Sequence, residues 1–133
     1  MNYKIILTAA LVLLAIFVWA SSNRQAQSFK TVPVSEFAAI IADTTAIQLL
    51  DVRTLKEFDE GHIAGALQID FYSDQFLPQT LAKLSKEKPI AIYCRSGRRS
   101  ASAAEKLAAE GYQLINLAGG ILAWQQAQMP LEK

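Results

Sequence analysis

Residues 90–100 read IAIYCRSGRRS, an apolar run followed by a polar loop. The run at residues 90–93 predicts a buried strand. The six residues after it are polar, and residues 100–110 are rich in strong helix formers. The segment therefore predicts a strand, a loop and a helix in succession. Ligands of parallel α/β sheets bind beyond the carboxyl ends of the strands, and Cys94 stands at such an end.

The segments on either side of this unit alternate in the same way. Five short segments are predicted to be strands, at residues 29–32, 47–52, 66–69, 90–93 and 114–117, and those at 47–52 and 90–93 are rich in apolar residues. Helical spacing and helix caps lie between these segments, and a last helix is expected after Gly120. Strands that alternate with helices predict a single α/β domain over residues 29–133, with a central parallel sheet and helices on both faces.

Three of the intervening helices carry specific signals. Ser35 is the predicted N-cap of the first. Thr54 and Glu57 have the form of a capping box, and Gly61 is the predicted stop of that short helix. The third helix, over residues 78–84, has one apolar face that we expect to join the core. This face is formed by Leu77, Leu81 and Leu84.

The N-terminal segment has a different character. Residues 5–20 are apolar except for Thr8, and Lys4 precedes them. This run of sixteen residues predicts a hydrophobic helix ahead of the domain. It is long for a signal-peptide core and slightly short for a span of roughly 20 residues. Residues 1–22 are thus either a signal peptide or a signal-anchor transmembrane helix, and residues 23–28 are a linker.

Both alternatives place the domain on the periplasmic side of a bacterial inner membrane, since Lys4 favours an N-terminus that stays inside. Membrane contact is expected only through residues 5–20, and only if they are retained.

Composition excludes several classes of function. The 133 residues include 13 Lys and Arg against 12 Asp and Glu, so a general electrostatic attraction to nucleic acid is not expected. One cysteine and one histidine exclude an internal disulfide and make a metal centre unexpected. The sequence indicates no cofactor.

The chemistry of the loop centres on Cys94. The helix behind it offers free N–H groups and a partial positive charge. Gly97 permits positive φ, and the guanidiniums of Arg95, Arg98 and Arg99 add charge. All these effects favour the thiolate over the thiol and attract an anionic substrate. The alternative is that Cys94 is a small buried hydrophobe, and a thiol sealed inside the core would argue against catalysis.

Three blocks of the sequence resemble the rhodanese (thiosulfate sulfurtransferase) family, in family order and over about residues 29–133. The loop Cys94-Arg95-Ser96-Gly97-Arg98-Arg99-Ser100 is similar to that family's active loop. The upstream block contains Leu50-Asp51-Val52-Arg53, Glu57-Phe58 and Gly61-His62-Ile63-Ala64-Gly65-Ala66. The closing block contains Leu117-Ala118-Gly119-Gly120-Ile121, with Trp124.

The resemblance implies that Cys94 is the catalytic nucleophile. It would take the outer sulfur of thiosulfate, or of a similar sulfane-sulfur donor, as a persulfide and pass it to a thiol or to cyanide. The resemblance also implies which residues bind the substrate. The backbone of residues 95–99 would hold the persulfide, and Arg98 and Arg99 would lie nearest the sulfonate. The full set is Arg95, Ser96, Gly97, Arg98 and Arg99.

Supporting roles are expected for three further residues. Asp51 is predicted to hydrogen-bond near the loop, Arg53 to form a structural ion pair, and Ser100 to support Cys94. His62 is expected to be structural, because a thiolate that is already formed needs no general base. Residues 70–77 are expected to line the rim of the site.

Two other interpretations stay open, a persulfide carrier with little turnover and a sensor based on oxidation of an exposed thiol. Phosphatase chemistry is disfavoured, because related dual-specificity phosphatases have a Cys-to-Arg spacing one residue longer than Cys94 to Arg99.

Overall fold

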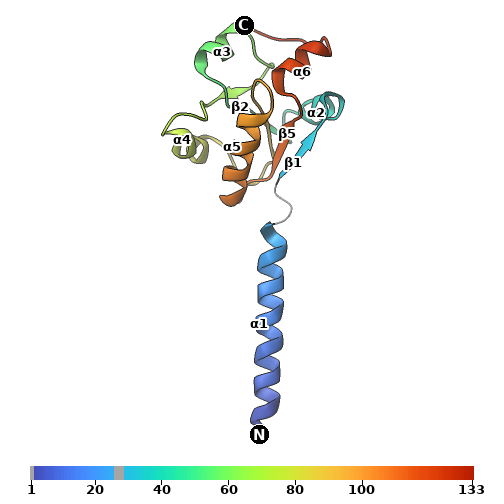
Figure 1. The fold of residues 1–133 in the computed structure, drawn as a ribbon, viewed down its shortest axis with the longest axis vertical. Coiled ribbons are helices and arrows are strands. Elements are labelled where there is room, and N and C mark those ends of the chain that lie inside the picture. Colours follow the sequence, from blue (N-terminus) through green and yellow to red (C-terminus); the bar gives the residue numbers. More distant parts are fainter. Residues whose placement is uncertain (1, 26–28) are drawn as a thin grey trace.

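The computed structural model describes residues 2–25 and 29–133, and it builds the domain around five parallel strands (Figure 1). Their order across the sheet is β1-β5-β4-β2-β3. The strands are β1 (Phe29–Val32), β2 (Gln48–Asp51), β3 (Leu67–Gln68), β4 (Ile90–Tyr93) and β5 (Leu114–Leu117). The helices are α1 (Tyr3–Gln25), α2 (Val34–Ile41), α3 (Leu55–Glu60), α4 (Phe76–Lys83), α5 (Arg98–Ala109) and α6 (Gly120–Gln126).

The central strand β4 shows why the sheet is covered on both faces. All four of its residues are buried, and it pairs in parallel with β2 on one side and β5 on the other. Side chains alternate along a strand, so Ile90 and Ile92 enter one core cluster while Ala91 and Tyr93 enter another. The predicted parallel sheet with helices on both faces is confirmed.

Each core cluster has its own pair of helices. On one face, α4 contributes Phe76 and α5 contributes Leu107. On the other, Phe37 of α2 meets Trp124 of α6 edge to face, with 6.4 Å between the ring centroids. The helix α3 has no buried residue and lies beyond the end of β2.

The start of α2 differs from the prediction. The N-cap is Pro33, in an extended conformation, and the N–H of Phe37 donates to its carbonyl at 2.9 Å. Ser35 therefore lies inside the first turn, and its prediction as the cap is wrong. Proline fixes φ and suits this position, and this helix carries no side-chain cap.

The predicted apolar face of α4 is also partly wrong. The helix begins at Phe76 and turns Phe76 and Thr80 inward, one helical turn apart. Leu77 and Leu84 pack against the core from its edge, whereas Leu81 is 42% exposed. Three leucines at helical spacing could not reveal that an aromatic residue before them takes the inward position.

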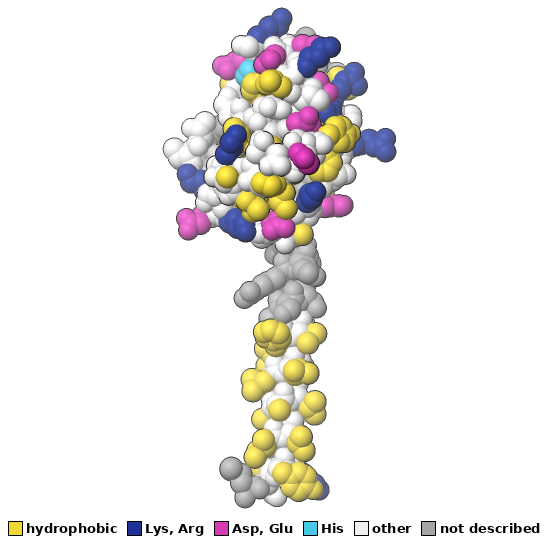
Figure 2. Space-filling view, turned by 90° about the vertical axis from the view of Figure 1, so that its left-hand side faces the viewer, with side chains coloured by type: hydrophobic (Ala, Val, Ile, Leu, Met, Phe, Trp, Pro, Cys, Tyr) yellow, Lys and Arg dark blue, Asp and Glu magenta, His cyan; other side chains and the backbone are white. Residues whose placement is uncertain are grey.

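The N-terminal segment forms the predicted helix, α1, and its described side chains, through Trp19, are exposed (Figure 2). Within residues 2–25 and 29–133, no helix is long and apolar enough to cross a membrane. A membrane-spanning anchor over residues 1–22 has no support from this finding, and the alternative of a signal peptide stays a prediction.

The predicted linker, residues 23–28, lies only partly within the described residues. Residues 23–25 belong to α1, and residues 26–28 lie outside the described part of the chain.

Candidate active site

The polar loop of the sequence lies at the carboxyl end of β4, as predicted. Its helix α5 begins at Arg98, two residues before the predicted start. Gly97 is the N-cap and has a left-handed backbone, with φ 99° and ψ −8°. Arg98 and Arg99 therefore stand in the first helical turn, at the positive end of α5.

Two donors from the loop and helix meet the sulfur of Cys94. The N–H of Gly97 donates to Sγ at 3.1 Å, and the hydroxyl of Ser100 donates at 3.3 Å. Hydrogen bonds of this kind stabilise a negatively charged sulfur. Ser100 thus stands where a supporting residue was expected.

Cys94 is nevertheless only 1% exposed and belongs to a core cluster. The sensor hypothesis assumed an exposed thiol, and that assumption is wrong. The two polar contacts distinguish Cys94 from an ordinary core cysteine, because a residue that serves only as a hydrophobe needs no donors directed at its sulfur.

Several backbone N–H groups around the sulfur are open. Within the described part of the chain, no hydrogen-bond acceptor meets the N–H groups of Arg95, Ser96, Arg98 and Arg99. Most backbone donors in folded proteins are paired, so a cluster of open ones at a helix N-terminus is a place for an anion.

The carbonyls of the loop, in contrast, are bound by α6. The N–H of Ile121 donates to Cys94 O at 2.9 Å, and the N–H of Leu122 donates to Arg95 O at 3.2 Å. Gly120 makes this approach possible, since a Cβ on it would lie 2.4 Å from Arg95 O. Sequence reasoning placed Gly120 only ahead of the last helix and gave it no role in the site. The glycine pair before a helix was the available signal.

The strongest contact of Arg99 is with a residue that the sequence did not place in the site. Its Nη1 and Nη2 donate to Glu57 Oε1 and Oε2 at 3.2 and 2.9 Å. Burial lowers the pKa of Arg99, but the hydrogen bonds and charge of Glu57 outweigh it, and the pKa of Arg99 is raised. The guanidinium also lies 5.8 Å from the ring centroid of Tyr72.

This contact changes the predicted capping box of α3. The hydroxyl of Thr54 accepts the N–H of Glu57 at 3.2 Å, so the N-cap is confirmed, as is Gly61 as the stop. The carboxylate of Glu57 is instead bound to the first turn of α5.

Asp51 and Arg53 form a buried ion pair at the end of β2, with Nη2 and Oδ2 2.6 Å apart. Burial lowers the pKa of Arg53, but the hydrogen bonds and charge of Asp51 outweigh it, and the pKa of Arg53 is raised. Arg53 also donates to the carbonyls of Glu57 and Gly61 at 3.3 and 2.8 Å. The predicted structural ion pair is present. The hydrogen bonds of Asp51 go to Arg53, not to the active loop.

His62 has the surroundings of a structural residue. Its Nδ1 lies 3.0 Å from the carbonyl of Phe58, and its ring stacks on the Phe58 ring with 3.7 Å between centroids.

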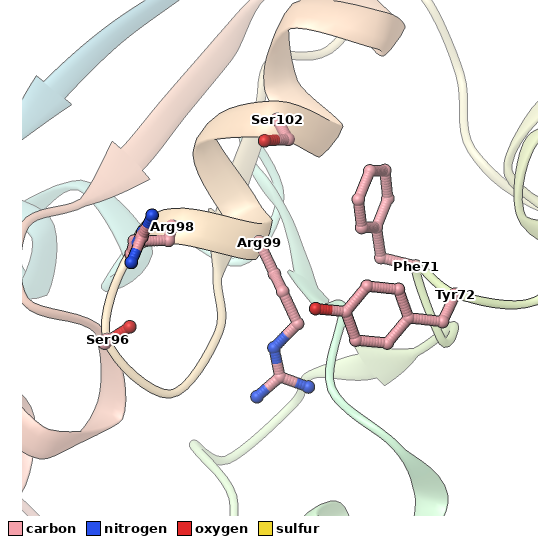
Figure 3. Close-up of a pocket in the computed structure, with 6 residues that line it drawn as sticks. All are labelled: Phe71, Tyr72, Ser96, Arg98, Arg99 and Ser102. Atoms are coloured by element: carbon pink, nitrogen blue, oxygen red, sulfur yellow. The ribbon is translucent and has the colours of Figure 1, made fainter.

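Two cavities flank the Glu57–Arg99 ion pair. The larger, of about 420 Å³, is shown in Figure 3, where the Arg99 side chain lies between the loop at Ser96 and the phenol of Tyr72. It is lined by Phe71, Tyr72, Ser96, Arg98, Arg99 and Ser102. The smaller, of about 230 Å³, is lined by Arg53, Glu57, Glu60, Gly61, Arg95, Ile121, Leu122 and Gln125. Of the segment 70–77 that was expected at the rim, Phe71 and Tyr72 line the larger cavity, whereas Phe76 and Leu77 belong to the core side of α4.

The described residues contain no cluster of metal-ligating side chains. Within residues 2–25 and 29–133, no group of three or more His, Cys, Asp or Glu side chains could hold a metal ion.

A cysteine at the end of a parallel strand, facing the N-terminus of a 12-residue helix with open N–H groups, defines an α/β protein with a cysteine-based anion site. The family model of the rhodanese-like domain matches residues 33–127. The chain belongs to this family.

Relatives at moderate identity agree with this assignment. A sulfurtransferase of Allochromatium vinosum is 38% identical over 92 residues, which cover 68% of this chain and 83% of the relative. Thiosulfate sulfurtransferase 18 of Arabidopsis thaliana is 32% identical over 123 residues, covering 84% and 89%. The crystal structure of a rhodanese-like domain protein from Staphylococcus aureus superposes with a TM-score of 0.63 at 33% identity, covering 71% and 90%.

Proposed function

We propose that this protein is a thiosulfate sulfurtransferase that carries sulfur as a persulfide on Cys94. The observation that carries the proposal is the sulfur of Cys94 held by Gly97 N–H and Ser100 Oγ beneath a loop of open backbone donors. Its relatives include proteins named thiosulfate sulfurtransferase from Arabidopsis thaliana and Shewanella oneidensis, the second 28% identical over 101 residues.

In the first half-reaction, the thiolate of Cys94 attacks the outer sulfur of thiosulfate. A new S–S bond forms to Cys94, the S–S bond of thiosulfate breaks, and its electron pair leaves with sulfite. The product is a persulfide whose terminal sulfur carries the negative charge. The N–H groups of Arg95, Ser96, Arg98 and Arg99 stand ready to bind that charge, as oxyanion holes do for oxygen.

In the second half-reaction, an acceptor nucleophile attacks the terminal sulfur. Cyanide leaves as thiocyanate, a thiolate leaves as its persulfide, and the Cys94 thiolate is restored. Cys94 is the only cysteine of the chain, so no internal thiol can take the sulfur and the acceptor must come from outside. Because Cys94 is 1% exposed, donor and acceptor reach it through the exposed loop residues Arg95, Ser96 and Arg98.

The test is formation of thiocyanate from thiosulfate and cyanide by the purified chain. We expect ping-pong kinetics, and release of one sulfite per protein when thiosulfate is supplied without acceptor. A folded protein that releases no sulfite contradicts the proposal at its first step.

A persulfide carrier is the second candidate, and the burial of Cys94 favours it, because a shielded persulfide persists. A relative named putative sulfur carrier protein YrkF, from Bacillus subtilis, is 28% identical over 104 residues. Mass spectrometry of protein from its own cells separates the two functions. A stable gain of one sulfur atom on Cys94 with negligible turnover identifies the carrier.

The same mass measurement tests the periplasmic location, which stays a prediction. Cleavage after the apolar run would shorten the chain at its N-terminus.

A further inference from the structure

The three guanidiniums of the active loop are not equivalent. Within the described part of the chain, Arg99 has a carboxylate partner, and Arg95 and Arg98 have none. The partner, Glu57, lies 42 residues away in α3, and both of its carboxylate oxygens accept hydrogen bonds from Arg99. The pair is partly shielded from solvent, since the side chains of Arg99 and Glu57 are 16% and 30% exposed. Shielding and two-point geometry make the partnership persistent.

The two cavities beside this pair differ in charge. Arg95 shares the smaller cavity with Glu57 and Glu60, which offset its positive charge. The larger cavity contains Arg98 and Arg99 and no acidic residue, and Ser96 and Ser102 add hydroxyls there. Because Glu57 neutralises Arg99, the exposed guanidinium of Arg98 is the uncompensated charge of the larger cavity.

We propose that Glu57 is a specificity-determining residue, which by holding Arg99 leaves Arg98, with Ser96 and Ser102, to bind the anionic group of the substrate. The inference rests on Cys94 as the nucleophile. In this inference, Glu57 limits the positive charge of the larger cavity, so that an anionic product such as sulfite is not retained. Loss of Glu57 frees Arg99 and strengthens the preference for anions.

The experiment compares alkylation of Cys94 by iodoacetate and iodoacetamide at equal pH and ionic strength. The reagents have similar size and react with the same thiolate, but only iodoacetate is an anion. The ratio of the two alkylation rates therefore reports the charge of the larger cavity and does not depend on the fraction of Cys94 that is ionised. Since Cys94 is the only cysteine, the alkylated fraction is read from the intact mass.

Glu57→Gln is expected to raise the ratio of iodoacetate to iodoacetamide rates about threefold to tenfold, as one freed charge does near a protein surface. Glu60→Gln is the matched control, because it removes the same charge from the same helix without contact to Arg99. We expect it to change the ratio less than about twofold. Arg98→Gln is expected to lower the ratio.

The double variant Glu57→Gln/Arg99→Gln is expected to lose the rise, because Arg99 transmits the effect. If Glu57→Gln does not fold, Arg99→Gln alone serves, since it leaves Glu57 unpaired and must lower the ratio. Equal ratios in Glu57→Gln and Glu60→Gln overturn the inference. The assay needs no sulfur transfer, so failure of the proposed function and failure of this inference are separate results.

Discussion

The carboxyl ends of β2 and β4 lie side by side, and they differ in how completely the polar groups that follow them are hydrogen-bonded. The strands pair in register, with Asp51 opposite Tyr93. After β2, the Arg53 guanidinium is satisfied by Asp51 and by the carbonyls of Glu57 and Gly61. After β4, the carbonyls of Cys94 and Arg95 are bound by α6, and the N–H groups of the loop are open.

The difference separates a structural end from a functional one. A buried charge is tolerated when every polar group around it is paired, and such a pair stabilises little beyond the cost of its own burial. Unpaired donors at a helix N-terminus cost stability, and they persist at β4 because α6 fixes the loop from behind. Polar groups that lack hydrogen-bond partners therefore distinguish the functional strand end from the structural one.

The largest difference between the two strand ends is expected when the sulfur of Cys94, after β4, is removed. Cys94→Ser should lower sulfur transfer by at least about 10,000-fold, or roughly 5.5 kcal/mol in the barrier, because a serine hydroxyl is not ionised and forms no persulfide. The free energy of unfolding should change little. Thiocyanate formation and urea denaturation measure the two quantities. A variant that retains a tenth of the activity would remove Cys94 from the mechanism.

At the closed end, Asp51→Ala should act on stability. It leaves Arg53 buried without a carboxylate, and we expect the free energy of unfolding to fall by about 3–5 kcal/mol. Urea denaturation is the measurement. Glu36→Ala is the control, because it breaks the exposed ion pair with Lys30 and should cost less than about 1 kcal/mol. Equal losses in the two variants would show that the buried pair has no special weight.

The open end depends on the close approach of α6, and Gly120→Ala tests it. The new Cβ would lie 2.4 Å from Arg95 O, so the loop must shift. We expect the free energy of unfolding to fall by about 1–3 kcal/mol, and the loss of turnover, expressed as a free energy, to be larger. Gly65→Ala is the matched control. Gly65 also has positive φ, but a Cβ there meets no atom within 4 Å. Turnover that falls equally in both would implicate backbone strain rather than contact with the loop.

The smallest expected effect is at the cap of α3. Thr54→Ala removes the acceptor of the Glu57 N–H and should cost about 1 kcal/mol of stability. Turnover should stay within about twofold, since Arg53 still ties α3 to β2 through the carbonyls of Glu57 and Gly61. Thermal unfolding and steady-state kinetics provide the comparison. A large loss of turnover would mean that the cap also positions Glu57 for Arg99.

Local signals predicted the strands well. The segments at residues 29–32, 90–93 and 114–117 match β1, β4 and β5. The strands β4 and β5 are buried along their whole length and are mostly apolar, whereas β1 is an edge strand with two exposed residues. Helix starts were less predictable. Pro33 and Gly97 set the starts of α2 and α5 through backbone conformation, which residue preferences for capping did not identify.

By itself, the sequence determined the parallel α/β order, the N-cap at Thr54 and the position of Cys94 between a strand and a helix, because these depend on residues near one another in the chain. Only the tertiary structure decided that Glu57 binds Arg99, that α6 holds the active loop and that Cys94 is buried. The contacts of Glu57 with Arg99 and of α6 with the loop join residues 27 to 42 positions apart. Such contacts depend on how the elements pack around the sheet, and no local pattern of residue types specifies that packing.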